Sequence, residues 1–303
     1  MAARQPDILL LQEVRAPDQI LRDLLGDGWH IAHEECQIKG RAGVAVASRL
    51  PVAAVRLGLG PAAPAATGRW VEADVVLPGL GASASRRGEE RASRLMVRGP
   101  VAPADPQSEE RAGGLVGQGG VAFASLRGEA GGLVGQGGAR LTVVSVYVYK
   151  GYLDDDGREG AKMAEKYAFM ERVTARLREL SDGRLLLVGG DLNVAHKQVD
   201  VANWRGNLKS VGCLPAERAH LDRWFGDLGL VDVGRALGGD GPGPYTWWTW
   251  RGQAFDRDVG WRIDYQMASP AWAARAVKAD VDRAASYDER WSDHAPVIVT
   301  YVV

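Results

Sequence analysis

Cysteine is scarce in this chain of 303 residues, which contains two, Cys36 and Cys213. Their spacing matches neither a zinc site nor a redox motif, so the sequence favours a reduced, intracellular protein over a disulfide-stapled extracellular domain. Long hydrophobic runs are absent too. The longest apolar stretches have the length of strands, which argues against a signal peptide, a membrane-spanning helix or a membrane partner. We therefore expect a cytoplasmic protein.

An excess of positive charge is also missing, because 37 lysines and arginines are balanced by 38 aspartates and glutamates. At a net charge of −1 no general basic surface attracts polyanions. An anionic substrate would have to be held locally, by a few cations or by a metal ion. Hydrophobic residues make up 46% of the chain and charged residues 25%, a composition typical of globular proteins with a substantial core.

Short apolar segments alternate with turns along most of the chain, and many are rich in β-branched and aromatic residues at strand length. The expected strands are Asp7–Leu11, Gly43–Ser48, Trp70–Val76, Leu141–Val148, Leu185–Val188, Tyr245–Trp250, Arg262–Met267 and Pro296–Val302. The expected helices are Asp18–Leu25, Glu159–Leu180 and Pro215–Leu228. Strands outnumber helices and do not alternate strictly with them, which predicts a layered α+β sandwich in a single domain, residues 1–303.

One segment, from about residue 79 to residue 138, is rich in Gly, Ala, Ser, Arg and Glu and contains the sequence AGGLVGQGG twice. Such glycine density favours a weakly ordered insertion, which is the interpretation we prefer. The stretch VAFASLRG between the two copies is a candidate for a short strand. A phosphate-cradling loop is the weaker alternative, because no Lys-Ser or Lys-Thr pair follows either copy.

Polar side chains stand next to several of the expected strands. Asp191 and Asn193 follow Leu185–Val188, and Asp293 and His294 precede the last strand. Taken singly, each pair could be no more than a turn that borders a strand. Asp264 lies inside a strand, where a charge needs a partner, and His294 could supply one. Such an Asp–His pair makes an acid or base whose tautomer the carboxylate fixes.

Glu13 adds a further carboxylate directly after the apolar strand Asp7–Leu11. If these strand ends meet, carboxylate and amide oxygens converge with one imidazole. Oxygen ligands suit a hard cation, Mg²⁺ or also Mn²⁺, and the lack of cysteine and histidine clusters argues against zinc. A hard cation, an activated water and a paired histidine are typical of phosphoester hydrolases.

Four motifs, LQE, GGDLNVAH, GWRIDY and SDHAPV, occur in this order and resemble the endonuclease/exonuclease/phosphatase superfamily. The chain is most similar to the exonuclease III branch, the apurinic/apyrimidinic endonucleases of base-excision repair. The resemblance implies a four-layer α/β sandwich of two packed sheets with helices outside. It also implies a metal-dependent nuclease that cuts duplex DNA 5′ of abasic sites, degrades it from 3′ ends and removes 3′-phosphates. Such a protein would act as a monomer, and near the nucleoid if it is bacterial.

The resemblance also implies roles for individual residues. Asp191 would orient or deprotonate the attacking water, and its partner Asn193 would contact the scissile phosphate. His294, paired with Asp264, would hold the scissile phosphate, and Tyr147 would complete the catalytic group. The expected metal ligands are Glu13 and Asp293. The expected substrate-binding residues are Trp247 and Trp261, which would press on a base-less sugar, and the cations Lys150 and Lys209, with Arg41 and Arg205 as further candidates.

Family members begin with a strand that carries a Trp-Asn signature, and that strand is expected to be missing here. That strand is expected to be central in a sheet, so its loss would leave unpaired backbone groups and a cavity. Either the natural protein starts further upstream, which we favour, or this is a truncated form with impaired activity. The alternative functions are a phosphatase or phospholipase of the same superfamily and a catalytically impaired DNA-binding remnant.

Overall fold

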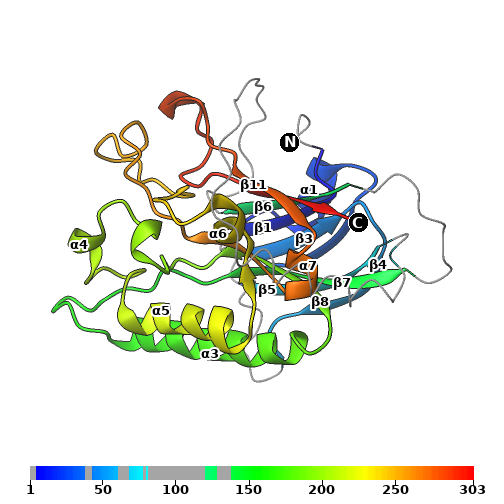
Figure 1. Ribbon diagram of the computed structural model, residues 1–303, viewed down its shortest axis with the longest axis horizontal. Coiled ribbons are helices and arrows are strands. Elements are labelled where there is room, and N and C mark those ends of the chain that lie inside the picture. Colours follow the sequence, from blue (N-terminus) through cyan, green and yellow to red (C-terminus); the bar gives the residue numbers. More distant parts are fainter. Residues whose placement is uncertain (1–4, 38–42, 61–67, 78–79, 81–119, 128–137) are drawn as a thin grey trace.

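The computed structural model describes residues 5–37, 43–60, 68–77, 80, 120–127 and 138–303 (Figure 1). Two six-stranded sheets carry the fold. The first sheet has the order β11 (Ala276–Val281), β12 (Val297–Val302), β6 (Val121–Arg127), β1 (Ile8–Val14), β3 (Gly43–Ser48) and β2 (His30–Glu34). The second has the order β4 (Val52–Leu57), β5 (Trp70–Leu77), β7 (Ala139–Tyr147), β8 (Leu185–Asp191), β10 (Asp264–Ala268) and β9 (Val231–Asp232). The pairs β6–β12 and β7–β8 are parallel, and the other pairs are antiparallel.

The main core lies between the two sheets, and strand β1 shows how the sequence builds it. Successive side chains of a strand point to opposite faces. Ile8 and Leu10 therefore pack in the cluster shared with strands β5, β7 and β8 of the second sheet. Leu9 and Leu11 pack on the opposite face. Each fully buried leucine or isoleucine stabilises the fold by about 1.5–3 kcal/mol relative to an exposed one.

Helices cover the outer faces of both sheets (Figure 1). Helix α1 (Asp18–Leu25) buries Leu21 against the outer face of the first sheet. Helices α3 (Ala161–Leu180) and α5 (Pro215–Asp222) lie on the second sheet, where Met170 and Leu221 join one cluster. The short helices are α4 (Trp204–Asn207), α6 (Val233–Gly238) and α7 (Pro270–Ala273). Within the described ranges, no helix is both long enough and apolar enough to cross a bilayer.

This architecture confirms the predicted α+β sandwich of two sheets flanked by helices. One strand that the sequence predicted, Tyr245–Trp250, does not form. Trp247 makes only isolated bridges there, to Trp261 and His294. The aromatic side chains of that segment gave it the composition of a strand, yet its backbone joins neither sheet as a strand. The expected helix Pro215–Leu228 ends earlier as an α-helix, at Asp222, and continues as a π-helical turn, Arg223–Asp227.

Strand β6 corrects the interpretation of the glycine-rich segment. Residues 121–127 pair with β1 on one side and β12 on the other, so this part of the segment is a central strand and not a weakly ordered insertion. The candidate strand is thereby confirmed over its described residues, Val121–Arg127. Strand β1 is paired on both sides, by β3 and β6, so β6 occupies an edge of β1 that a missing strand could have left unpaired. The remainder of the segment lies outside the described residues, except for residues 80, 120 and 138.

Buried amide side chains tie the two sheets together near one end. Gln12 Nε2 of β1 donates to Ser145 Oγ of β7 at 2.8 Å. Gln266 Nε2 of β10 donates to the carbonyls of Phe123 and Val297 in the first sheet, at 2.8 and 3.0 Å. Because each amide hydrogen bond crosses the core, the two sheets are held in one relative register at this end.

Candidate active site

Three candidate residues form one row across the second sheet. In the register of β7, β8 and β10, Tyr147 lies opposite Asp191, and Asp191 lies opposite Asp264. The GGD sequence makes this row possible, although not as the tight turn that two glycines favour in isolation. Gly189 and Gly190 lie inside β8, where a Cβ on Gly189 would stand 2.5 Å from Leu10 Cδ1 of the other sheet. The glycines therefore permit close packing.

His294 reaches this row from the loop that precedes β12 of the first sheet. Its Nδ1 contacts Asp264 Oδ2 at 2.9 Å and Oδ1 at 3.1 Å. Its Nε2 lies 4.0 Å from Asp191 Oδ2 on the other side. The structure thus brings together the Asp–His pair expected from the sequence and places the free imidazole nitrogen toward Asp191.

Asn193 is oriented toward Asp191 by its own backbone. The residue has φ +49°, in the left-handed region that asparagine tolerates better than most residues. In this conformation its amide Nδ2 donates to Asp191 Oδ2 at 2.7 Å and to the Val148 carbonyl at 3.0 Å. Its backbone N–H donates to Asp191 Oδ1 at 2.8 Å. Both carboxylate oxygens of Asp191 are therefore fixed by a single neighbour.

Glu13 enters from the first sheet through an irregularity in β1. The register between β1 and β3 shifts between Leu11 and Val14, and Glu13 has φ +53°. Bulges of this kind redirect one side chain out of the strand pattern. The Glu13 carboxylate accepts a hydrogen bond from Tyr147 Oη at 2.8 Å and one from Arg15 Nη2 at 3.2 Å. Glu13 is thereby linked to the row on the second sheet.

Asp293 and the two candidate tryptophans form the other side of the site. Trp247 Nε1 donates to Asp293 Oδ2 at 2.9 Å. The indole rings of Trp247 and Trp261 meet edge to face, with centroids 6.3 Å apart. Both rings are partly exposed. Backbone bridges join Trp247 to Trp261 and to His294, so this aromatic pair is fixed directly beside the histidine.

The pKa values of His294 and Asp191 are both raised, which favours the charged form of the histidine and the neutral form of the carboxyl group. Burial alone lowers the pKa of His294, but the charge and hydrogen bond of Asp264, with the charges of Asp191 and Asp293, raise it to about 10. His294 is therefore an imidazolium at neutral pH. Burial raises the pKa of Asp191 well above its usual value, with further increases from Asp264 and Glu13 and a decrease from His294. A carboxyl group with a raised pKa is a stronger proton acceptor once ionised.

Among the described residues, one group of acidic and histidine side chains has the spacing of a metal site, namely Asp191, Asp264 and His294. Within this group the carboxylates are the more suitable ligands, because an imidazolium has no free lone pair. Asp293 offers another oxygen. Its Oδ1 is buried and has no hydrogen-bond partner within the described ranges.

Among the described residues, the lysines and the arginine predicted to bind DNA lie outside the catalytic group. Lys150 is exposed in the loop after β7, and Lys209 is exposed in the turn after α4. Arg205 is exposed within α4, and Arg41 lies outside the described residues. None of the three described cations makes a side-chain contact with the catalytic group in the structure, so their binding role stays a prediction.

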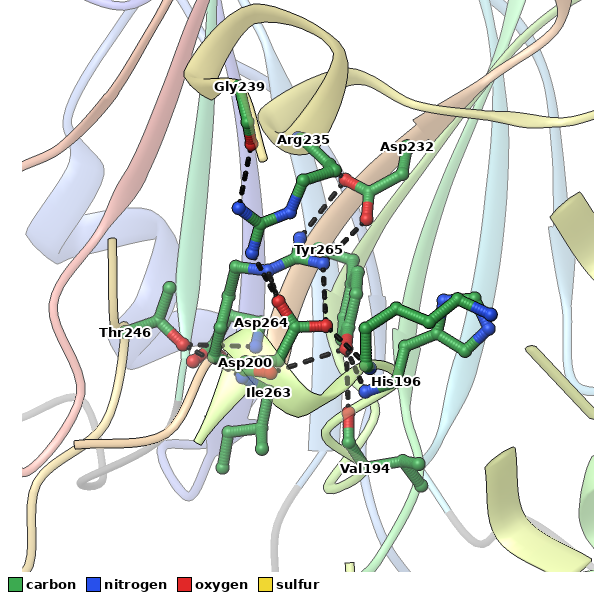
Figure 2. A network of polar contacts seen from close by, with 12 residues as sticks. Val194, His196, Asp200, Asp232, Arg235, Gly239, Thr246, Ile263, Asp264 and Tyr265 are labelled. Atoms are coloured by element: carbon green, nitrogen blue, oxygen red, sulfur yellow. Dashed lines mark hydrogen bonds and ion pairs between the residues drawn. The ribbon is translucent and has the colours of Figure 1, made fainter. Parts of the chain in front are cut away.

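The sequence analysis missed the residues that hold Asp264 in place. Thr246 Oγ1 accepts hydrogen bonds from the backbone N–H groups of Ile263 and Asp264, each at 3.1 Å. The neighbouring Arg262 is buried between the carboxylates of Asp200 and Asp232. Figure 2 shows these two carboxylates in one polar network with Thr246 and Asp264. The sequence signal that could have revealed this support was Arg262, a charged residue beside an apolar strand. Its partners Asp200 and Asp232 lie 62 and 30 residues away, so spacing along the chain could not identify them.

Gly120 was missed as well. It is buried at the start of β6, and a Cβ built on it would overlap Asp264 Oδ1 and stand 3.2 Å from Asp264 Cγ. In the sequence it was one of many glycines in a repetitive segment, so nothing marked it as a neighbour of the site. The structure shows that the last residue of the first AGGLVGQGG copy packs against the carboxylate that holds His294.

Sequence relatives are consistent with the motifs that carry this site. The profile of the Endonuclease/Exonuclease/phosphatase family matches residues 1–294. An exodeoxyribonuclease of Bacillus subtilis is 33% identical over 153 residues, which cover 50% of this chain and 59% of that protein. A second, from Streptococcus pneumoniae, is 32% identical over 155 residues, with coverage of 50% and 54%. The DNA repair nuclease APEX1 of Danio rerio is 35% identical over 118 residues, with coverage of 39% and 36%. The chain thus spans little more than half the length of these exodeoxyribonucleases.

Solved structures share the fold across nearly the whole chain. The 3′-5′ exonuclease NExo of Neisseria meningitidis has a TM-score of 0.70 at 25% identity, with coverage of 100% of this chain and 91% of that one. An AP endonuclease from Archaeoglobus fulgidus has a TM-score of 0.68 at 24% identity, with coverage of 99% and 90%. The resemblance to the exonuclease III branch is confirmed by these relatives, and the chain belongs to the Endonuclease/Exonuclease/phosphatase family.

Proposed function

We propose that this chain is a metal-dependent DNA repair nuclease that cleaves duplex DNA 5′ of abasic sites. In the same site it would degrade DNA from 3′ ends and remove 3′-phosphates. The observation that carries the proposal is the arrangement of the Asp264–His294 pair against Asp191, an acid and a base 4.0 Å apart at one sheet end. The names of its relatives, exodeoxyribonuclease and DNA repair nuclease, support DNA as the substrate.

In this mechanism each member of the catalytic group has one task. Asp191 accepts the proton of the attacking water, and Asn193 keeps both of its oxygens oriented. The imidazolium of His294 donates a hydrogen bond to a phosphate oxygen, where negative charge grows in the transition state. Asp264 holds that ring in place and maintains its charge. Burial and the nearby carboxylates raise the pKa of Tyr147, so its hydroxyl stays a donor throughout.

The residues present fit a hard divalent cation. The predicted ligands Glu13 and Asp293 would hold it, although the group that has metal-site spacing among the described residues is Asp191, Asp264 and His294. Asp293 Oδ1 is buried and has no hydrogen-bond partner within the described ranges, so it is an oxygen that such an ion would satisfy. Oxygen donors of this kind favour Mg²⁺, with Mn²⁺ as a substitute. When bound, the ion would neutralise charge on the phosphate. Its positive charge would also oppose the upward pKa shift of Asp191, which keeps that base ionised.

Substrate selection would rest on the aromatic side of the site. Trp247 and Trp261 are partly exposed beside His294, where their rings could contact a sugar that has lost its base. Such a contact would discriminate by shape, without hydrogen bonds to base edges. Lys150 and Lys209 would bind the DNA backbone from exposed positions. We also propose that residues 1–303 act as one domain, as a monomer in the cytoplasm.

The decisive experiment uses a duplex with a single abasic-site analogue, incubated with the chain in Mg²⁺ and in chelator. A nick 5′ of the lesion that disappears with chelator supports the proposal. Binding to the duplex without a nick would instead indicate the impaired DNA-binding remnant. Release of phosphate from lipid or inositol phosphates, with intact DNA, would favour the superfamily phosphatase or phospholipase.

A further inference from the structure

Lys166 is a lysine with no exposed side-chain surface, on the face of α3 that packs on the second sheet. Its ammonium group makes three hydrogen bonds: to Glu217 Oε1 at 2.6 Å, to the Lys150 carbonyl at 2.9 Å and to the Asn193 carbonyl at 3.2 Å. All three donors of the ammonium are therefore used. Two of the acceptors belong to segments of the candidate site.

Glu217 uses its second oxygen on a third segment. Its Oε2 accepts the backbone N–H groups of Gly212 and Leu214, at 2.6 and 3.0 Å. Like Lys166, its side chain has no exposed surface. The ion pair thus joins helices α3 and α5 to three loops, which contain Lys150, Asn193 and Gly212.

These loops lead to both halves of the candidate site. The Asn193 loop fixes Asp191, as described above, and Ala195 N–H donates to the Gly212 carbonyl at 2.8 Å. Gly212 in turn packs against the aromatic side, since a Cβ on it would stand 3.0 Å from Trp261 and 3.2 Å from the Asn193 carbonyl. A movement of the ion pair would therefore displace both the catalytic carboxylate of Asp191 and the ring of Trp261.

We propose that Lys166 and Glu217 are positioning residues, which set Asn193 and Asp191 against the phosphate and Trp261 against the sugar. The inference rests on the proposed nuclease function and adds a structural requirement to it. Neither side chain has exposed surface through which it could touch a substrate, so both act through the loops that they hold.

The energetics of buried ion pairs favour this role over a purely stabilising one. Desolvation of two charges largely cancels their attraction, so a buried pair is weak evidence of net stability. What it provides is fixed geometry: Lys166 bonds only if two carbonyls and one carboxylate converge on its ammonium. Asn193 holds a left-handed backbone conformation, and a hydrogen bond to its carbonyl restricts that conformation further.

The test measures single-turnover cleavage of the abasic duplex by Lys166→Met and Glu217→Gln, each normalised to its folded fraction. Lys166→Met keeps most of the aliphatic volume and removes the charge. Glu217→Gln is the milder change, for the case in which the first variant folds poorly. We expect the rate at saturating protein to fall about 10- to 100-fold, the order of loss caused by a misplacement near 1 Å. The protein concentration that gives half of the maximal rate should change by less than the rate.

Glu72→Gln is the matched control. Glu72 is also a buried carboxylate paired with an arginine of α3, Arg176, at 2.6 Å, yet it hydrogen-bonds to no candidate site residue. This variant should lose stability and keep its rate per folded molecule. Wild-type rates in folded Lys166→Met and Glu217→Gln would overturn the inference, and so would an equal loss in Glu72→Gln. If wild-type protein cleaves no duplex, the proposed function itself fails, and the positioning role falls with it.

Discussion

Replacing Gly120 with alanine tests whether the glycine-rich segment takes part in the candidate site. Gly120 is buried, and its Cα faces the Asp264 carboxylate so closely that an added Cβ would overlap Oδ1. An ordinary carbon–oxygen contact needs about 3.3 Å. The overlap exceeds an ångström, so either Asp264 or the start of β6 must move by that amount. Gln12 Oε1 would lie 3.3 Å from the same Cβ, so the added methyl group cannot shift toward Gln12.

The expected consequence follows from what Asp264 holds. Its carboxylate fixes the ring of His294 through contacts at 2.9 and 3.1 Å. A displacement near 1 Å in a catalytic group lowers a rate by roughly 100-fold. Overpacking also destabilises a core by about 1–3 kcal/mol. We therefore expect Gly120→Ala to lose about two orders of magnitude in cleavage rate and a modest part of its stability.

The assay is single-turnover cleavage of the abasic duplex at saturating protein, with unfolding followed in parallel. Gly226→Ala is the control, because a Cβ at that position meets no atom within 4 Å. Its rate and stability should stay close to wild type. A Gly120→Ala protein that folds and cleaves at the wild-type rate would refute the close approach of β6 to Asp264.

Three further predictions concern the site and its support. His294→Ala and Asp191→Ala should each fold normally and lose about 100- to 1,000-fold in cleavage rate; the double variant should lose far less than the product, because the two act as a unit. Chelation of divalent cations should abolish cleavage while duplex binding, followed by fluorescence anisotropy, persists; cleavage at full rate in chelator would contradict the metal requirement. Asp200→Asn should destabilise the fold most at neutral pH, as chemical unfolding across a pH series would show. Burial alone would raise the pKa of Asp200, but Arg262 and Arg235 hold it below its usual value. A depressed carboxyl pKa stabilises the fold above the unfolded value of about 3.9, and that contribution is lost as the pH falls below it. The stability gap between the two proteins should therefore begin to narrow below about pH 4 and keep narrowing as the pH falls toward the depressed pKa of Asp200. A gap that is constant down to about pH 3 would contradict this reasoning.

The sequence itself determined the fold class and the main chemistry. Local patterns sufficed to predict β1, β3, β8 and α3, because residues close together in the sequence show the apolar period of a strand or of a helix, two or 3.6 residues. The candidate catalytic residues were also recognisable, since Asp191, Asn193 and His294 each stand at a strand end within a distinctive motif. Their convergence could be inferred once the strands were assumed to share an edge.

Lys166 shows where local patterns fail. Its position, three residues after Met163 and four before Met170, places it on the buried face of α3, and this was the available signal. Lysine is almost never fully buried without a partner. That partner, Glu217, lies 51 residues further along the chain, so only the packing of α3 on α5 reveals it.

The tertiary structure alone decided the role of the glycine-rich segment. Glycine density predicts flexibility, yet residues 121–127 pair with β1 and β12 in the middle of a sheet. Strand pairing joins residues that are far apart in the chain, and its stability depends on neighbours on both edges, which composition does not encode. For the same reason Gly120 looked like part of a repeat in the sequence, whereas in the fold it lies beside Asp264, where the packing leaves no room for a Cβ.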